Sequence, residues 1–277
     1  MRGATRQAWC FAAGLLVLTF VLAGGLAGLR ILLPPPTVRL ADRPPPLLIP
    51  AAYPAKFKPR HILIDVGHGG KDTGAKSRWS APEKDVNLRV AKALGRHLRA
   101  TGKYRVSFTR QTDAAVSISA RRRMSNARRP DAFLSIHSDW AYEFYKHGTW
   151  MIWSSRQQKG VGEKSARLAA YLGAGLKTER LPLYNWGPER RHLHAMGGTS
   201  NYLCAWPEYS SYVTDARRLG VLDKNQRPAV LIETHFLSNP LSVAFFQTDE
   251  TIGRFCEGVE AGLRGFFLAK EPSAGGK

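Results

Sequence analysis

The chain has 277 residues, 44% of them hydrophobic, which suits one packed domain with appendages. Its formal charge of +20, from 41 Lys and Arg against 21 Asp and Glu, favours anionic partners such as nucleic acid, anionic lipid or an acidic polymer. Only three cysteines are present, which excludes a disulfide scaffold. Cys204 and Cys256, the two outside the apolar N-terminal run, are candidates for a single disulfide.

An uncharged apolar run extends from Ala8 to Leu29 and follows Arg2 and Arg6. It has about the ~20 residues that a helix needs to cross a bilayer. The positive charges before it predict a cytoplasmic N-terminus and export of the remainder. We therefore expect residues 1–33 to be an anchor in the inner membrane, with a cleaved signal segment as the alternative. Export would place the rest on the extracytoplasmic side, periplasmic or facing the cell wall, and argues against a nucleic-acid partner.

The remaining chain divides by composition into three parts. Residues 34–55 are rich in proline and predict a stiff, extended linker. Residues 56–270 have the composition of a folded domain, and residues 271–277 form a polar tail that we expect to be flexible. No internal repeat is present.

Within the domain, short apolar runs alternate with amphipathic stretches. Strands are predicted over His61–Val66, Tyr104–Thr109, Ala132–His137, Thr149–Trp153 and Ala229–Glu233. Helices are predicted over Lys84–Arg99, Ile118–Ala127, Lys164–Leu176 and Thr251–Leu268. The segment Lys177–Arg218 lacks a clear period and is predicted to be an irregular insert. This alternation predicts a single α/β domain with a mainly parallel twisted sheet covered by helices on both faces.

Three of the predicted strands lead to residues that can bind a metal or transfer a proton. They lead to His68, which is flanked by glycines, to His137 and to Glu233, while Glu83 stands just before the first helix. Strand ends on one side of a parallel sheet converge in space. Two histidines and a carboxylate suit a catalytic Zn²⁺ site with an open position, and a further carboxylate nearby would serve as general base.

Each of these residues also has an ordinary structural interpretation. An acid such as Glu83 in a first helical turn complements the helix dipole, and His137 after an apolar run suits a hydrogen-bonded core histidine. Glu233 is harder to explain in this way, because a carboxylate buried after Val230-Leu231-Ile232 needs a partner or a function. Three other histidines are interpreted as surface or structural residues: His192, His194 and His235.

Four separated stretches of the chain contain the candidate site residues: Ile64–Ala75, Glu83–Leu88, Leu134–Ser138 and Pro228–Pro240. Thr109-Arg110, and Arg121 with Asn126, fall between them. In order and spacing, the chain from about Lys56 to Lys270 resembles the zinc-dependent N-acetylmuramoyl-L-alanine amidases of the amidase type 3 family.

The resemblance implies that His68, Glu83 and His137 bind one Zn²⁺. It also implies that Glu233 is the catalytic carboxylate, which takes a proton from water and returns it to the departing nitrogen. The implied reaction is hydrolysis of the amide between N-acetylmuramic acid and L-alanine, with peptidoglycan as substrate. Three further residues are predicted to bind the substrate: Arg110, Arg121 and Asn239.

The chain departs from the family pattern in two places. Asp139 stands where the family usually has Asn. Some members carry an inhibitory helix that an activator protein releases, but Trp153 to Lys164 is too short for it, so we do not expect activator gating of that type. The extra length lies in Lys177–Arg218, and its aromatic residues are hypothesised either to line a substrate groove or to form a small satellite core: Tyr184, Trp186, Tyr202, Trp206 and Tyr209.

Two other functions fit parts of the pattern. A zinc peptidase acting on stem-peptide cross-links would use the same metal chemistry. A non-catalytic module that holds peptidoglycan would share the fold, although the presence of all four site residues argues against it.

Overall fold

The computed structural model describes residues 47–184, 213–215 and 219–269. The predicted anchor, most of the predicted linker, the tail and four of the five aromatic residues of the insert lie outside these residues. Among the residues described, no helix is both long enough and apolar enough to cross a bilayer.

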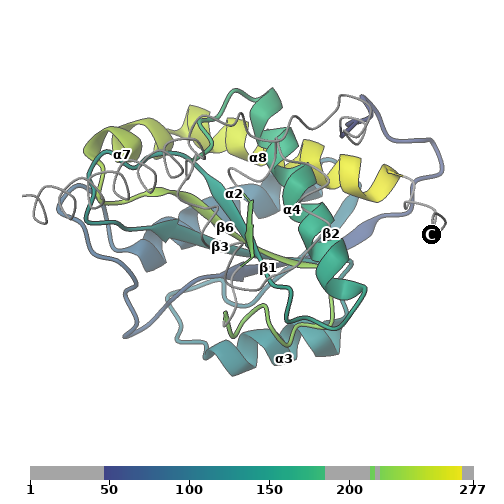
Figure 1. Ribbon diagram of the computed structural model, residues 1–277, viewed down its shortest axis with the longest axis horizontal. Helices are drawn as coiled ribbons and strands as arrows, with labels where there is room; N and C mark the ends of the chain where they lie inside the picture. The colour runs from purple at the N-terminus through teal and green to yellow at the C-terminus, as the bar shows by residue number, and fades with distance from the viewer. Residues whose placement is uncertain (1–46, 185–212, 216–218, 270–277) are drawn as a thin grey trace, which may run out of the picture. The chain divides into compact units, whose positions relative to one another are not determined.

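Six strands form one sheet in the order β2-β1-β3-β6-β4-β5 (Figure 1). They are β1 (Arg60–Val66), β2 (Tyr104–Phe108), β3 (Ala132–Asp139), β4 (Trp150–Trp153), β5 (Val213–Asp215) and β6 (Ala229–Phe236). The only antiparallel pairing among them joins β4 to β6; the pairs β1–β2, β1–β3, β3–β6 and β4–β5 are parallel. The mainly parallel sheet predicted from the sequence is confirmed.

Helices cover both faces of this sheet (Figure 1). One face carries α2 (Glu83–Ala100), α4 (Val161–Thr178) and α8 (Asp249–Leu268), and the opposite face carries α3 (Ile118–Arg128). Because side chains alternate along a strand, Ile62, Ile64 and Val66 enter the large core under α2, α4 and α8. Leu63 and its neighbours on the other face enter a smaller core beside α3. The α3 face is thus the less covered one.

Two short elements were not predicted from the sequence. β5 is a strand of three residues inside the predicted irregular insert and is too short to show a period. It pairs with β4 and forms the edge strand of the sheet. The helix α7 (Pro240–Phe246) follows β6, with Pro240 in its first turn. The Asn239 side chain caps it by accepting from the backbone N–H groups of Leu241 and Ser242.

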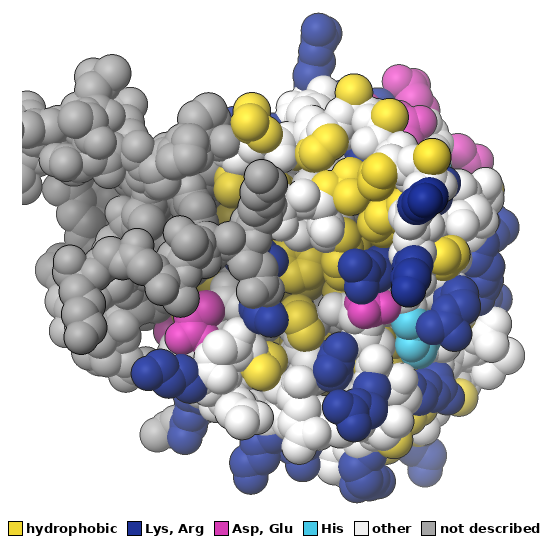
Figure 2. Space-filling model, turned by 90° about the vertical axis from the view of Figure 1, so that its right-hand side faces the viewer, with side chains coloured by type: hydrophobic (Ala, Val, Ile, Leu, Met, Phe, Trp, Pro, Cys, Tyr) yellow, Lys and Arg dark blue, Asp and Glu magenta, His cyan; other side chains and the backbone are white. Residues whose placement is uncertain are grey.

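The packed domain also begins earlier than residue 56. Leu47, Ile49 and Tyr53 lie against the large core, and Arg264 Nε donates to the Pro50 carbonyl at 2.7 Å. These apolar side chains bind the end of the proline-rich segment to α8. The surface at the end of α8 is rich in Lys and Arg and poor in Asp and Glu (Figure 2).

The helices α4 and α8 approach each other through glycines. A Cβ added to Gly175 would lie 2.1 Å from the Gly258 carbonyl oxygen and 2.5 Å from the Gly262 nitrogen. The backbones therefore touch where no side chain fits.

We expect Gly175→Ala to lower the free energy of unfolding by about 1–3 kcal/mol, because the added methyl group forces the two helices apart. Gly253→Ala, on the solvent side of α8, is the matched control, since a Cβ there meets nothing within 4 Å. It should instead stabilise the protein by about 0.5–1 kcal/mol through helix propensity. Urea unfolding of both variants measures the difference, and equal effects would contradict close backbone packing.

Candidate metal centre and active site

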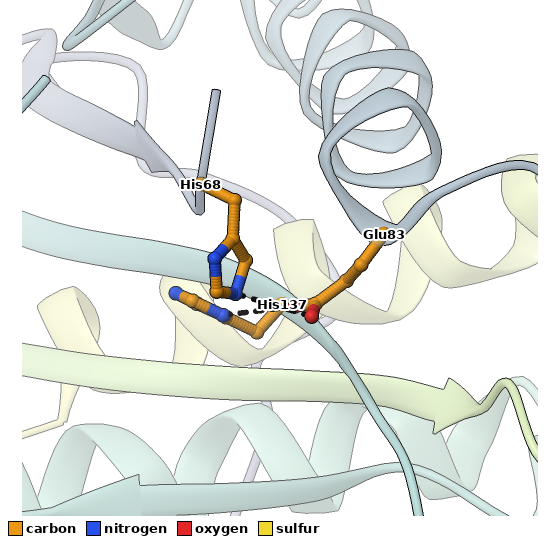
Figure 3. Close-up of side chains that lie close together, drawn as sticks. All are labelled: His68, Glu83 and His137. Atoms are coloured by element: carbon orange, nitrogen blue, oxygen red, sulfur yellow. Dashed lines mark hydrogen bonds and ion pairs between the residues drawn. The ribbon is translucent and has the colours of Figure 1, made fainter. Parts of the chain in front are cut away.

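Three predicted ligands converge at the carboxyl ends of β1 and β3. His68 lies in the turn after β1, His137 on β3, and Glu83 is the first residue of α2 (Figure 3). His68 Nε2 lies 3.1 Å from Glu83 Oε2, and His137 Nδ1 lies 3.0 Å from Glu83 Oε1. Each carboxylate oxygen thus faces one imidazole, although the three residues come from segments far apart in the sequence.

Glu83 is buried and held by neighbouring donors. Oε2 accepts from the Ala75 backbone N–H at 2.8 Å, and Oε1 accepts from Asn87 Nδ2 at 3.1 Å and from the Ser138 backbone N–H at 3.2 Å. Burial alone would raise the pKa of Glu83, but hydrogen bonds and charge from His137 and His68 outweigh it and hold that pKa well below its usual range. The group is therefore an ionised carboxylate, as a metal ligand must be.

The turn that carries His68 has an unusual backbone. His68 has a φ of 60°, in the left-handed region that residues other than glycine seldom adopt. Two buried arginines hold it in place through backbone carbonyls. Arg121 Nη2 donates to the His68 carbonyl at 2.7 Å, and Arg110 Nη2 donates to the Gly67 carbonyl at 2.8 Å. Arg121 in turn pairs with the buried Asp65 at 2.7 Å.

Two glycines leave room for the ligands. A Cβ at Gly67 would lie 2.5 Å from the His137 ring. At Gly74, which has a φ of 63°, a Cβ would lie 2.4 Å from Glu83 Oε2 and 2.6 Å from His68 Cδ2. Any side chain at either position would displace a ligand, which explains the glycines around His68 in physical terms.

Glu233 lies beside this group on the next strand. It pairs in register with His137, so the two side chains project from the same face of the sheet. Its Oε2 atom is buried and has no hydrogen-bond partner among the described residues. Burial, followed by the charges of Asp139 and Glu83, raises the pKa of Glu233 well above its ordinary value. A carboxylate oxygen of this kind, without a partner in the described part of the chain, is available to accept a proton.

The donor set fits a metal ion. One ligand atom from each of His68, Glu83 and His137 can be chosen so that all three lie within 4.8 Å of one another. The other nitrogen of His68, Nδ1, lies 2.9 Å from Asp72 Oδ2, which fixes the ring as outer carboxylates fix metal-bound histidines. The structure therefore brings together all three predicted ligands and places Glu233 next to them.

We expect Asp72→Ala to weaken metal binding by about 10–100-fold, because the ring of His68 loses the carboxylate that orients it. Competition with a chromophoric chelator measures the affinity. Asp113→Ala is the control, since Asp113 is also a surface acid near this turn but contacts Lys84 and the Gly70 backbone instead of a ligand. Equal losses in the two variants would contradict a specific role for Asp72.

A cleft of about 990 Å³ opens beside the ligands. His68 and His137 line it together with the Gly69–Asp72 turn, the start of α3 and the segment Leu219–Val221. The two ligand histidines therefore lie in the wall of a cleft whose volume is large enough to hold part of a substrate.

The residues predicted to bind substrate make their hydrogen bonds within the protein. Arg110 and Arg121 donate to the turn at His68, as described above. Asn239 caps α7, and its Nδ2 donates to the Lys146 carbonyl at 3.1 Å. A direct contact of these three residues with substrate stays a prediction.

Other sequence-based predictions have mixed outcomes. His235 is buried outside the ligand set, stacked on Phe246, and burial lowers its pKa to about 3. Tyr184 packs against Phe236 with ring centroids 4.9 Å apart, which favours the satellite-core interpretation for this residue.

Asp139, which departs from the family pattern, accepts a hydrogen bond from the Trp150 indole at 3.1 Å. Cys256 is a buried free thiol in α8, whereas Cys204 lies outside the described residues.

Two outer residues were missed by the sequence analysis as parts of the site. Asp72 and Asn87 each follow a ligand by four residues, Asp72 after His68 and Asn87 after Glu83. For Asn87 this spacing places both side chains on one face of α2, a signal that could have identified it. The pair formed by Asp65 and Arg121 joins residues 56 positions apart and carried no such local signal.

A parallel α/β domain with these ligands beside an unpaired carboxylate is suited to metal-assisted hydrolysis. The chain belongs to the N-acetylmuramoyl-L-alanine amidase family, whose model matches residues 62–264. It is 25% identical over 231 residues to the N-acetylmuramoyl-L-alanine amidase AmiC of Escherichia coli O6:H1, covering 76% of this chain and 53% of that protein. It is 32% identical over 193 residues to the probable cell wall amidase LytH of Staphylococcus aureus, covering 69% of this chain and 50% of the other.

The fold is also that of a solved amidase. The crystal structure of N-acetylmuramoyl-L-alanine amidase from Clostridium difficile 630 aligns with a TM-score of 0.62 at 22% identity, over 77% of this chain and 100% of that one. The whole of that chain thus aligns with part of this one. The chain spans about half the length of AmiC and LytH.

Proposed function

We propose that this protein hydrolyses the amide bond between N-acetylmuramic acid and the L-alanine of the stem peptide in peptidoglycan. The observation that carries the proposal is the convergence of His68, Glu83 and His137 beside Glu233, within a chain of the amidase family. The cleft along the two histidines gives a glycan strand with its stem peptide a path to this group.

We propose Zn²⁺ as the metal, because two imidazoles and one carboxylate form a common catalytic zinc set that leaves a position open. When bound, Zn²⁺ supplies Lewis-acid chemistry, polarising a carbonyl and making water more acidic. Glu83 and the two histidines hold it, and Asp72 and Asn87 keep their ligand atoms in place.

The chain's own proton carrier in this mechanism is Glu233. Its unpaired Oε2 accepts a proton from the attacking water, and the raised pKa makes it a stronger base than an exposed glutamate. The same oxygen then delivers the proton to the nitrogen of the departing L-alanine. That nitrogen must leave protonated, because an amide anion is a very poor leaving group.

We propose that residues 1–33 hold the protein at the cytoplasmic membrane, with the catalytic domain on the extracytoplasmic side. The proposal rests on the arginines before the apolar run Ala8–Leu29. Gating by an activator of the helix-release type is not part of the proposal. Residues 154–160, between β4 and α4, form a short turn without a helix.

The test uses dye-labelled sacculi and residues 44–277, which form one compact unit and leave out the predicted anchor. We expect release of label that a chelator abolishes and stoichiometric Zn²⁺ restores. A non-catalytic binding module would bind the sacculi without releasing label, and a metal-independent enzyme would resist the chelator.

A further inference from the structure

A second cavity lies at the opposite end of the sheet from the metal ligands. It has a volume of about 350 Å³ and is lined by residues at the starts of β1 and β6, at the first turns of α4 and at the end of α8. It is thus separated from the catalytic cleft by the length of the strands. Its charged lining residues are Arg60, Asp131, Lys164, Arg167 and Arg227.

Four cations therefore face one acid across this cavity. Asp131 is already engaged, because it accepts from the His61 backbone N–H at 2.7 Å and pairs with Arg60 at 3.5 Å. Figure 2 shows the side of the molecule on which α8 ends, and there Lys and Arg far outnumber Asp and Glu. An anion is the ligand that this charge balance favours.

Arg167 is a largely desolvated cation in the lining of the cavity. Arg167 is only 7% exposed, and its Cζ lies 4.9 Å from the centroid of the Phe266 ring. Its Nε is buried and has no hydrogen-bond partner among the described residues. The Nε atom of Arg60 is likewise buried and has no hydrogen-bond partner in the described part of the chain, although its Nη1 pairs with Asp131. Leaving such donors unpaired is unfavourable, and the planar guanidinium matches the oxygen geometry of phosphate.

The sequence before the described residues points to a membrane lipid as the source of that anion. Leu47 and Ile49 pack against the core, and a Cβ on Gly265 would lie 3.2 Å from Ile49 Cγ1. Gly265 immediately precedes Phe266 and Phe267, which line the cavity. Ile49 therefore lies close to the end of α8 that lines the cavity, and in the sequence the apolar run Ala8–Leu29 precedes Ile49 by 20 residues.

We propose that this cavity binds the phosphate of an anionic phospholipid headgroup, so that the basic face rests on the membrane and the catalytic cleft points away from it. Basic residues close to a bilayer surface are each attracted to anionic lipid, and a cavity adds geometric selection for the phosphate. The inference does not depend on the amidase activity, and its test does not measure that activity.

The test is sedimentation of the domain of residues 44–277 with vesicles. We expect binding to vesicles containing phosphatidylglycerol and none to pure phosphatidylcholine. Lys164→Gln and Arg167→Gln should each weaken binding by about five-fold, as expected for loss of one cation near the surface. Lys177→Gln, an exposed lysine at the other end of α4, is the matched control and should change binding by less than about two-fold. Circular dichroism melting verifies that Arg167→Gln is folded, and Lys164→Gln tests the site without altering a buried residue.

Three results would overturn the proposal. The first is equal loss of binding in Lys164→Gln and Lys177→Gln, which would indicate diffuse attraction with no site. The second is binding that appears only after residues 270–277 are deleted, which would make the chain's own tail the occupant. The third is tight binding of a soluble phosphodiester oligomer, weakened by Lys164→Gln, without any binding to vesicles.

Discussion

Glu233→Gln is expected to lower turnover of peptidoglycan by about 10²–10⁴-fold while the protein keeps its metal. Glutamine has the shape of glutamate but cannot accept a proton at the buried Oε2 position. Because Glu233 is not among the three grouped ligands, its loss leaves the metal donors untouched. Rates of sacculus digestion and metal content by atomic absorption, measured on the same preparation, check both halves of the prediction.

Asp139→Asn is the matched control for this experiment. Asp139 is a second partly buried carboxylate close to Glu233, burial raises its pKa, and an asparagine oxygen can still accept from the Trp150 indole. Most of the activity should survive in Asp139→Asn. If Glu233→Gln retains more than a tenth of the wild-type rate, or loses its metal, the role given to Glu233 is wrong.

His68→Ala is expected to lose the metal and with it all measurable activity. The variant removes one of three protein ligands, and Glu83 loses one of the two imidazoles that stabilise its charge. Since a ligand that binds only the native state raises its stability, the rise in melting temperature on adding Zn²⁺ should also disappear. Calorimetric titration with Zn²⁺ and melting curves with and without the metal measure these effects.

His147→Ala serves as the control, because His147 is an exposed histidine in the loop after β3 whose Nδ1 lies 3.1 Å from the Tyr145 carbonyl oxygen, and it is not one of the three grouped ligands. It should bind Zn²⁺ as the wild type does. A His68→Ala protein that still binds one equivalent with unchanged affinity would rule out the proposed ligand set.

Several elements that the sequence predicted correctly carry an apolar run or an apolar stripe. β1, β3 and β6 contain the apolar runs Ile62–Ile64, Ala132–Leu134 and Ala229–Ile232, and α8 carries an apolar stripe whose members Phe255, Val259 and Leu263 are all fully buried. The ligands were predictable because each follows or precedes such an element. Parallel pairing then brings His137 and Glu233 into register on one face.

What the sequence did not predict depends on contacts between distant segments. β5 has three residues and exists through its pairing with β4. Arg110 and Arg121 were predicted to bind substrate, yet their hydrogen bonds reach carbonyls of the turn at His68, more than 40 positions away in the sequence. A charged residue near a motif does not reveal from the sequence whether it faces solvent or holds the backbone behind the site.

The most direct test of the proposed activity is mass analysis of the soluble products after digestion of purified sacculi by the domain of residues 44–277 loaded with Zn²⁺. We expect free stem peptides that begin with an L-alanine N-terminus, together with glycan strands stripped of peptide. Muropeptides that keep the link between N-acetylmuramic acid and L-alanine and are cut only within the stem would contradict it, and would identify the enzyme as a peptidase acting on cross-links.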